Sequence, residues 1–269
     1  MAHARIVGLL TALGLTLSLV ACDDRSSREI TIGAASSLRP LLDEVVPLFE
    51  RETGITAEVS YGASGAIARQ IEQGAPIDVF ASADTTQIDE LIRGRFLVLD
   101  SIFTWGYGQL VAVRPVDGDP SVITLADADR IAIANPETAP YGAAAKQLME
   151  QANVWDQLKG NIVFAETALQ ALLFAQAGEV DFAFVPLSLL RADSSGVTVV
   201  DQAIRVNGFD RPVTGFTSLD QSLALVAGSD VLHEAREFVK FFASDEVVRV
   251  FESLGYTTAP ELNCCTSAR

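Results

Sequence analysis

The chain has 269 residues, of which 49% are apolar, so it can bury a large core in one large domain or two smaller ones. Its 35 Asp and Glu outnumber its 19 Lys and Arg, which gives a formal net charge of −16. Nucleic acid and anionic lipid headgroups are therefore excluded as expected partners, because the chain repels them. An anion bound to this protein must be held by local dipoles rather than by the overall charge.

The N-terminus has the pattern of a secretion signal. Arg5 precedes an uncharged run at residues 6–21, which is too short to span a membrane comfortably. The run ends in "LVAC", which resembles the lipobox of bacterial lipoproteins, where the signal is cut before the Cys and the thiol is acylated. We expect residues 1–21 to be a lipoprotein signal peptide and Cys22 to be lipidated, so that the protein is periplasmic or extracytoplasmic and anchored to the cell membrane. An ordinary signal peptide is the alternative.

Other residues that commonly carry chemistry are few. Cys264 and Cys265 are adjacent in the C-terminal tail and could pair only through a strained ring, so no core disulfide is predicted. We interpret them as tail residues without a structural role, with a metal or redox role as the alternative. His233 is the one His outside the signal, and no "GxSxG" occurs, which argues against a zinc site and a serine hydrolase.

After a polar linker at residues 22–28, short β-rich runs alternate with helical patterns. Several runs are apolar at nearly every position, as in parallel strands that are buried on both faces. This alternation predicts an α/β fold with mostly parallel sheets flanked by helices. The predicted strands are residues 30–34, 56–61, 78–83, 109–114, 130–134, 161–165, 181–185, 197–200 and 222–227. The predicted helices are residues 38–53, 65–73, 86–93, 142–151, 169–176, 234–242 and 245–254.

Two stretches suggest that the chain passes between two lobes. "SIFTWGYGQLVAVRP" precedes a second series of strand–helix units, and "NGFDRPVTGFTSLDQ" is a possible return crossing. We therefore predict a first lobe from residues 29–105 and 220–269, the latter including the C-terminal tail. Residues 106–219 form the predicted second lobe.

Small and polar residues stand where predicted helices follow strands. These are Ser36 and Ser37, Ser64 in "YGASGAIARQ", Tyr141 and Ala168. In such sheets ligands bind beyond the carboxyl ends of the strands. Helix starts offer unpaired N–H groups and partial positive charge, and serine hydroxyls add further donors. Each serine alone is more often a helix cap. Together, from two lobes, these groups predict a cleft that holds a tetrahedral oxyanion without Lys or Arg.

Four segments resemble the periplasmic molybdate-binding proteins of molybdate ABC transporters. They are "AASSLRPLLDEVVPLFERETG", "YGASGAIARQIEQGAPIDVFASAD", "ANPETAPYGAAAKQLM" and "AETALQALLFAQAGEVDFAFVPLS". The resemblance runs over about residues 29–259. It implies a two-lobed type II periplasmic-binding-protein fold that closes by a hinge around molybdate or tungstate. It also implies delivery of the anion to the membrane subunits of an ABC permease, with no catalysis and no cofactor. We expect a monomer.

The resemblance also assigns roles to the candidate residues. Ser37 and Ser64 match the two serines of the first lobe, and Ser36 joins Ser37 in some members. Tyr141 and Ala168 match positions where the second lobe donates backbone N–H groups. The resemblance thus implies that the oxyanion, with its metal atom, is bound through these five residues.

The sequence departs from the family pattern at one position. Pro186 stands where other members carry a Tyr whose phenol reaches the ligand, and Pro has neither a hydroxyl nor an N–H. Tyr141 or Ser188 are the candidates to compensate. A site made only of donors suits molybdate, tungstate or sulfate, which carry no proton at pH 7. The alternatives are a receptor for sulfate, another oxyanion or an organic anion, a sensory module without transport, and a hydrolase using Ser37 or Ser64.

Overall fold

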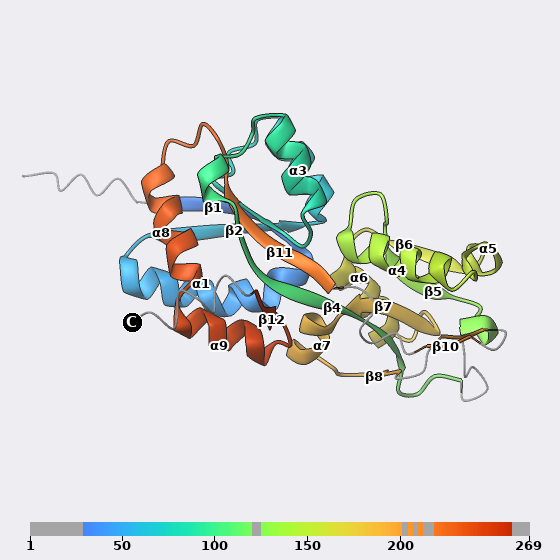
Figure 1. Cartoon of the computed structure of the whole chain (residues 1–269). Helices are drawn as coiled ribbons and strands as arrows, with labels where there is room; N and C mark the ends of the chain where they lie inside the picture. Colours follow the sequence, from blue (N-terminus) through green and yellow to red (C-terminus); the bar gives the residue numbers. More distant parts are fainter. Residues whose placement is uncertain (1–28, 120–124, 201–203, 207–208, 212–217, 260–269) are drawn as a thin grey trace, which may run out of the picture.

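The structure is a computed structural model that describes residues 29–119, 125–200, 204–206, 209–211 and 218–259. It shows a two-lobed α/β protein in which strands β1 to β7 and the helices that follow them occur in the alternating order that the sequence predicts (Figure 1). The predicted signal peptide, the lipidation site Cys22, the linker, and Cys264 and Cys265 lie outside the described residues.

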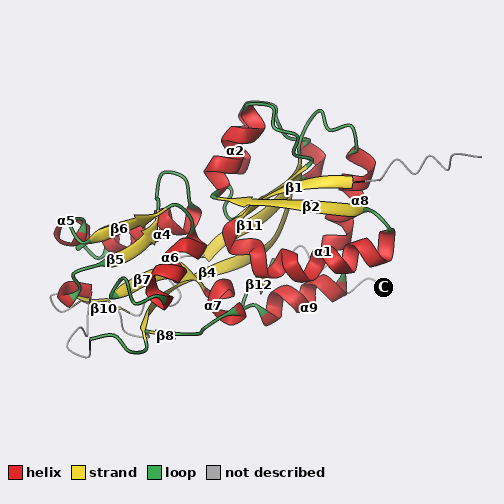
Figure 2. Ribbon diagram, turned by 180° about the vertical axis from the view of Figure 1, so that it is seen from behind, coloured by secondary structure: helices red, strands yellow, loops and turns green. Residues whose placement is uncertain are grey.

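The larger lobe is built on three parallel strands in the order β2-β1-β3. Helices α1 and α9 lie on one side of this sheet (Figure 2), and α2 (Figure 2) and α3 (Figure 1) lie on the other. Helix α8 packs against α1 and β11. The bounds are β1 (Glu29–Ala35), α1 (Arg39–Thr53), β2 (Thr56–Gly62), α2 (Ser64–Glu72), β3 (Val79–Ser82), α3 (Thr86–Arg93), α8 (Leu232–Phe242) and α9 (Asp245–Ser253).

The smaller lobe contains three further parallel strands, in the order β7-β5-β6. Helices α4 and α6 both pack against β5 and β7. The bounds are β5 (Ile131–Ala134), α4 (Pro140–Gln151), α5 (Trp155–Leu158), β6 (Ile162–Ala165), α6 (Ala168–Gln176), β7 (Phe182–Pro186), α7 (Leu187–Ala192) and β8 (Val197–Val199).

Two antiparallel strands, β4 (Phe103–Pro115) and β11 (Ser218–Leu225), join the lobes into one sheet of order β2-β1-β3-β11-β4-β7-β5-β6. The first half of β4 pairs with β11, and the second half pairs with β7 and β8. The predicted return crossing at 207–221 contains β10 and the first half of β11, but residues 207–208 and 212–217 of it lie outside the described residues.

All nine predicted strands and all seven predicted helices are present; α3 has the predicted bounds, and the other elements have shifted ends. The largest error concerns β4, which begins six residues before the predicted residue 109. The sequence does not predict this extension because it contains Gly106 and Gly108, and glycine has low strand propensity. The sequence also did not predict α5, α7, the 3₁₀ turns η1 (Ser36–Leu38), η2 (Leu99–Ser101) and η3 (Leu125–Asp127), or the short strands β9 (Ile204–Val206), β10 (Phe209–Arg211) and β12 (Thr257–Thr258).

A continuous apolar core extends through both lobes. Trp105 of β4 is fully buried, and its ring packs against Phe242, Phe251 and Tyr256 with centroid distances of 5.3, 5.0 and 4.9 Å. Aromatic packing of this kind fixes the C-terminal segment against the joining strand. Within the described ranges, no helix has the length and apolar character needed to cross a membrane.

Candidate functional site

The five predicted site residues lie where helical segments follow the carboxyl ends of parallel strands. Ser36 and Ser37 form the start of η1 after β1, Ser64 begins α2 after β2, Tyr141 is in the first turn of α4 after β5, and Ala168 begins α6 after β6. All five are buried, with exposed fractions from 0% at Ser64 to 7% at Ser36. The β-α topology therefore puts each residue at the edge of the sheet where ligands bind in this class of fold.

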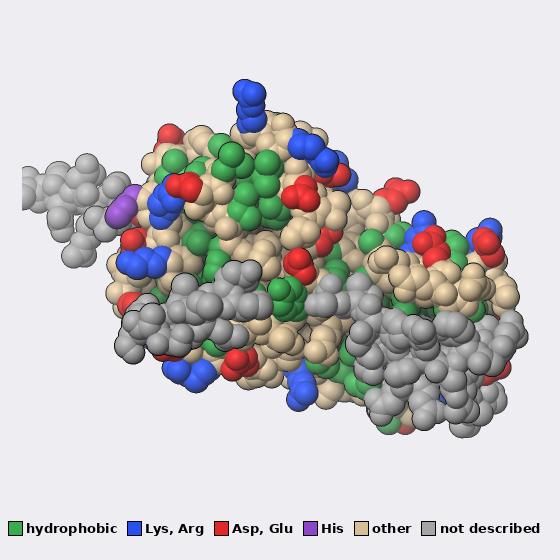
Figure 3. Space-filling view, in the orientation of Figure 1, with side chains coloured by type: hydrophobic (Ala, Val, Ile, Leu, Met, Phe, Trp, Pro, Cys, Tyr) green, Lys and Arg blue, Asp and Glu red, His purple; other side chains and the backbone are tan. Residues whose placement is uncertain are grey.

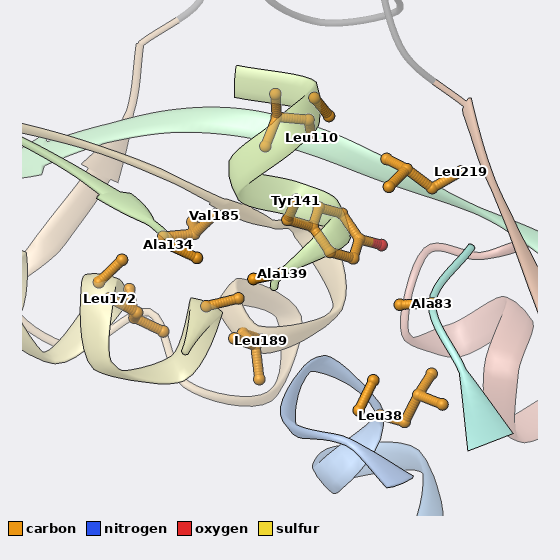
Figure 4. Packing of buried hydrophobic residues seen from close by; sticks show 14 of the residues in the cluster. Leu38, Ala83, Leu110, Ala134, Ala139, Tyr141, Leu172, Val185, Leu189 and Leu219 are labelled. Carbon is orange, nitrogen blue, oxygen red and sulfur yellow. The ribbon is translucent and has the colours of Figure 1, made fainter. Parts of the chain in front are cut away.

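Contacts between the lobes bring these helix starts together. The backbone N–H of Gly65 in α2 donates to the carbonyl of Thr138, just before α4, at 2.9 Å. The turn η1 contacts α6. Figure 4 shows Tyr141 pointing its hydroxyl from α4 toward Ala83, which follows β3, with Leu38 nearby. The predicted site residues thus lie on elements that meet at one junction.

Three of these helical starts have no capping side chain. The N-cap residues of η1, α2 and α4 are Ala35, Ala63 and Ala139, which carry no acceptor. Only α6 differs, because the Thr167 hydroxyl accepts from the Gln170 N–H at 3.2 Å. The serines at the first two starts therefore do not cap their helices, and the simple capping explanation does not hold for them.

The hydroxyl groups at the junction are available as donors. The Ser64 Oγ accepts the backbone N–H of Ala83 at 3.2 Å, which leaves its own proton free to be donated elsewhere. The Ser37 Oγ and the Tyr141 hydroxyl are buried and have no hydrogen-bond partner within the described part of the chain. Buried polar atoms without a partner are rare in proteins, and a bound ligand is one physical reason for them.

The structure distinguishes the two candidates that could compensate for Pro186. The Ser188 Oγ donates to the Ser37 carbonyl oxygen at 3.1 Å, and the Tyr256 hydroxyl donates to the same oxygen at 3.2 Å. These two protons are used to fix the backbone of Ser37. The Tyr141 hydroxyl, in contrast, donates no hydrogen bond to any described residue. It lies against Gly108 of β4, where an added Cβ would overlap it.

A further polar residue, which the sequence pattern does not predict as part of the site, also lies at this junction. Gln221 of β11 is fully buried, and its Nε2 donates to the carbonyls of Ala83 at 3.1 Å and Leu219 at 2.8 Å. The predicted strand begins at residue 222, and Gln221 falls at the end of the predicted return crossing at residues 207–221. Its position directly before an apolar strand was the available signal.

A groove of about 270 Å³ opens beside the junction, between α2, α3 and the segment before α4. Its rim carries Arg69 and the carboxylates of Glu72, Asp84, Glu90 and Glu137. Burial raises the pKa of Asp84 above its usual value. Figure 3 shows acidic side chains on this part of the larger lobe. The rim is therefore mainly negative, and the donors that could hold an anion are the neutral groups deeper in the junction.

Burial keeps the phenols at the junction protonated. It raises the pKa of Tyr141 well above the usual value, with a smaller contribution from nearby Tyr256, and it also raises the pKa of Tyr256. Both hydroxyls therefore remain hydrogen-bond donors at every physiological pH.

This shift predicts a loss of stability at alkaline pH. An unfolded Tyr titrates near pH ~10, whereas folded Tyr141 titrates higher, so between these values the folded state binds more protons. The free energy of unfolding must therefore fall as the pH rises above about 10. We expect a shallower fall for Tyr141→Phe than for the wild type in urea unfolding from pH ~8 to ~11. Ser37→Ala removes a hydroxyl that does not titrate in this range and should parallel the wild type. Identical slopes for Tyr141→Phe and the wild type would contradict the prediction.

Known proteins resemble this chain in sequence and in fold. A family described as bacterial extracellular solute-binding protein matches residues 30–257. A Bacillus subtilis protein named as an ABC transporter substrate-binding lipoprotein, YvgL, is 31% identical over 94% of this chain and 96% of its own length. The molybdate-binding protein ModA of Rhodobacter capsulatus is 29% identical over 92% of this chain and 95% of its own.

Solved structures give the same fold. The periplasmic molybdate-binding protein of Azotobacter vinelandii superposes with a TM-score of 0.72 at 26% identity, over 85% of this chain and 98% of that one. The sulfate-binding protein SubI of Mycobacterium tuberculosis, at 17% identity and a TM-score of 0.69 over 87% of this chain and 88% of that one, shares the fold. With its two lobes, its joining strands and a family match over nearly all the described residues, the chain belongs to the bacterial extracellular solute-binding proteins.

Proposed function

We propose that this protein captures molybdate, or its close analogue tungstate, outside the cytoplasmic membrane and delivers it to the permease of an ABC importer. The observation that carries the proposal is the pair of buried hydroxyls, Ser37 Oγ and Tyr141 Oη, that have no partner within the described residues and lie at uncapped helix starts. Relatives named as molybdate-binding proteins support the choice of anion. Membership of the family makes the protein a binding protein and not an enzyme.

The chemistry of the proposed site favours an anion that carries no proton. The side-chain groups available are the hydroxyls of Ser36, Ser37, Ser64 and Tyr141, and backbone N–H groups at the helix starts, including that of Ala168, complete the set. Hydrogen bonds from such donors to a charged oxygen contribute roughly 1.5–3 kcal/mol each. A hydrogen phosphate would need an acceptor for its O–H, whereas molybdate, tungstate and sulfate need none.

Tyr141 has a second role in this proposal. Family members place a phenol at the position of Pro186, which cannot donate. The free Tyr141 hydroxyl, kept protonated by burial, supplies the missing donor from α4 instead of from the end of β7.

Closure around the anion takes place through the joining strands β4 and β11, with lobes of residues 29–105 plus 220–269 and residues 106–219. The mature protein is a monomer that begins at Cys22, through which a lipid anchors it to the membrane. The name of the Bacillus subtilis relative, an ABC transporter substrate-binding lipoprotein, supports this anchor.

A panel of anions tests the function. We expect molybdate and tungstate at 100 times their dissociation constants to stabilise the folded protein by about 2.7 kcal/mol, seen as a rise in melting temperature. At the concentration used for molybdate, sulfate should give a smaller rise in melting temperature and hydrogen phosphate should give none. A larger shift with sulfate than with molybdate would assign the protein to sulfate, and no shift with any of the four anions would contradict oxyanion binding.

A further inference from the structure

Gln221 is a fully buried amide on a strand that joins the two lobes. It pairs with Gly106 of β4, and the register of β11 shifts directly after it, between Gln221 and Ser222. A β-bulge of this kind redirects side chains locally. Next to this bulge, the Gln221 side chain points into the core between β11 and the end of β3.

The orientation of the Gln221 amide is determined by its partners. Both groups that it contacts, the main-chain carbonyls of Ala83 and Leu219, can only accept hydrogen bonds. The NH₂ group must therefore face them, and the Oε1 atom, which has no partner among the described residues, faces away.

The same contact connects the joining strand to Ser64. Ala83 is held on both sides, because its carbonyl accepts from Gln221 Nε2 at 3.1 Å and its N–H donates to Ser64 Oγ at 3.2 Å. All three residues are fully buried. Since the Ser64 oxygen accepts from Ala83, the direction in which Ser64 can donate its own proton depends on where Ala83 lies.

We propose that Gln221 is a positioning residue for anion binding, which acts through Ala83 on the Ser64 hydroxyl. This inference rests on the proposed function, because Ser64 must bind the anion for its orientation to matter. The geometry gives the residue two tasks. It fixes the donor direction of Ser64, and it ties that donor to β11, the strand about which the lobes close.

A double-mutant cycle with molybdate as the probe tests the coupling. Gln221→Met keeps the approximate shape and removes the amide, and we expect about fivefold weaker binding by calorimetry. Because Gln221 acts through Ser64, the double variant with Ser64→Ala should bind about as weakly as Ser64→Ala alone. Ser37 has no contact with Ala83 among the described hydrogen bonds, so the losses of Gln221→Met and Ser37→Ala should multiply.

A matched control separates positioning from folding. Ser222 is the next residue, is equally buried, and its hydroxyl bonds to that of Thr104 at 2.9 Å. Ser222→Ala removes one side-chain hydrogen bond of β11, where Gln221→Met removes two, and it does not touch Ala83. It should lower the melting temperature of the ligand-free protein, by less than Gln221→Met does, and leave molybdate affinity unchanged.

A second variant keeps the test valid if Gln221→Met does not fold. In Gln221→Glu the ionised carboxylate repels the two carbonyls, whereas the protonated acid can donate one hydrogen bond, and burial raises the pKa of such an acid. Its molybdate affinity should therefore improve as the pH falls from ~8 to ~6, relative to the wild type at each pH.

The outcomes separate this inference from the proposed function. A wild type that binds molybdate, together with losses for Gln221→Met and Ser64→Ala that multiply, would overturn the positioning role alone. So would equal affinity losses for Ser222→Ala and Gln221→Met, or a Gln221→Glu variant with no pH response. A wild type that binds none of the four oxyanions would overturn both.

Discussion

Ser37→Ala should weaken molybdate binding by at least about tenfold while the ligand-free protein stays as stable as the wild type. The expected loss follows from removing one hydrogen bond to a charged oxygen, worth roughly 1.5–3 kcal/mol. The unchanged stability follows from the absence of any partner for the Ser37 hydroxyl among the described residues, since nothing in the protein loses a hydrogen bond. Because the Ser37 hydroxyl is buried and makes no hydrogen bond to the described residues, its removal tests a binding role separately from stability.

Ser64→Ala should give a similar loss of affinity but a different loss of stability. The Ser64 oxygen accepts the buried N–H of Ala83, so its removal leaves that group without a partner and costs about 1–3 kcal/mol of unfolding free energy. Calorimetry measures the affinities and urea unfolding measures the stabilities. Wild-type affinity in Ser37→Ala would remove that residue from the site, and wild-type affinity in both variants would contradict the site as a whole.

Gly65→Val should prevent the lobes from closing. Even a single Cβ at Gly65 would lie 3.0 Å from the Thr138 oxygen and 3.2 Å from the Gln87 Oε1, and valine adds two methyl groups to it. The crowding would also push apart the 2.9 Å hydrogen bond between the Gly65 N–H and the Thr138 carbonyl. Overpacking of this kind costs about 1–3 kcal/mol, so molybdate affinity should fall on the order of ten- to hundredfold.

The effect should be confined to the closed form. We expect the two lobes to separate at this point when no anion is bound, so the ligand-free melting temperature should stay close to that of the wild type. X-ray scattering should show a wider molecule for Gly65→Val than for the wild type when both are mixed with molybdate. Gly160→Val is the matched control, because an added Cβ there meets no atom within 4 Å. Tight binding by Gly65→Val would show that this contact has no part in closure.

The sequence predicts the local features of the molecule well. The alternation of apolar runs and helical patterns identifies the strands and helices that position the site, because periodicity is a property of neighbouring residues. The small residues at the starts of α2 and α4 indicate where the helices begin, and the structure places them at one junction. Whether Ser36, Ser37, Ser64, Tyr141 and Ala168 bind the anion stays a prediction.

What the sequence could not predict depends on contacts between distant residues. The bond from Ser188 to the Ser37 carbonyl spans 151 positions, and the bond from Gln221 to Ala83 spans 138. No local pattern specifies such pairs. The two glycines in β4 are a further case, since Gly106 and Gly108 look like a loop until Thr257 and Tyr141 are found packed against them.

Strand β4 belongs to both lobes at once, since one end of it pairs with β11 and the other with β7. A single ladder of backbone hydrogen bonds therefore runs through the whole molecule. Neither half can be excised as an autonomous module, because any cut leaves one partner sheet with an unpaired edge. Duplication or recombination of the gene would have to preserve the two halves together, and thermal denaturation is expected to melt both in one cooperative transition.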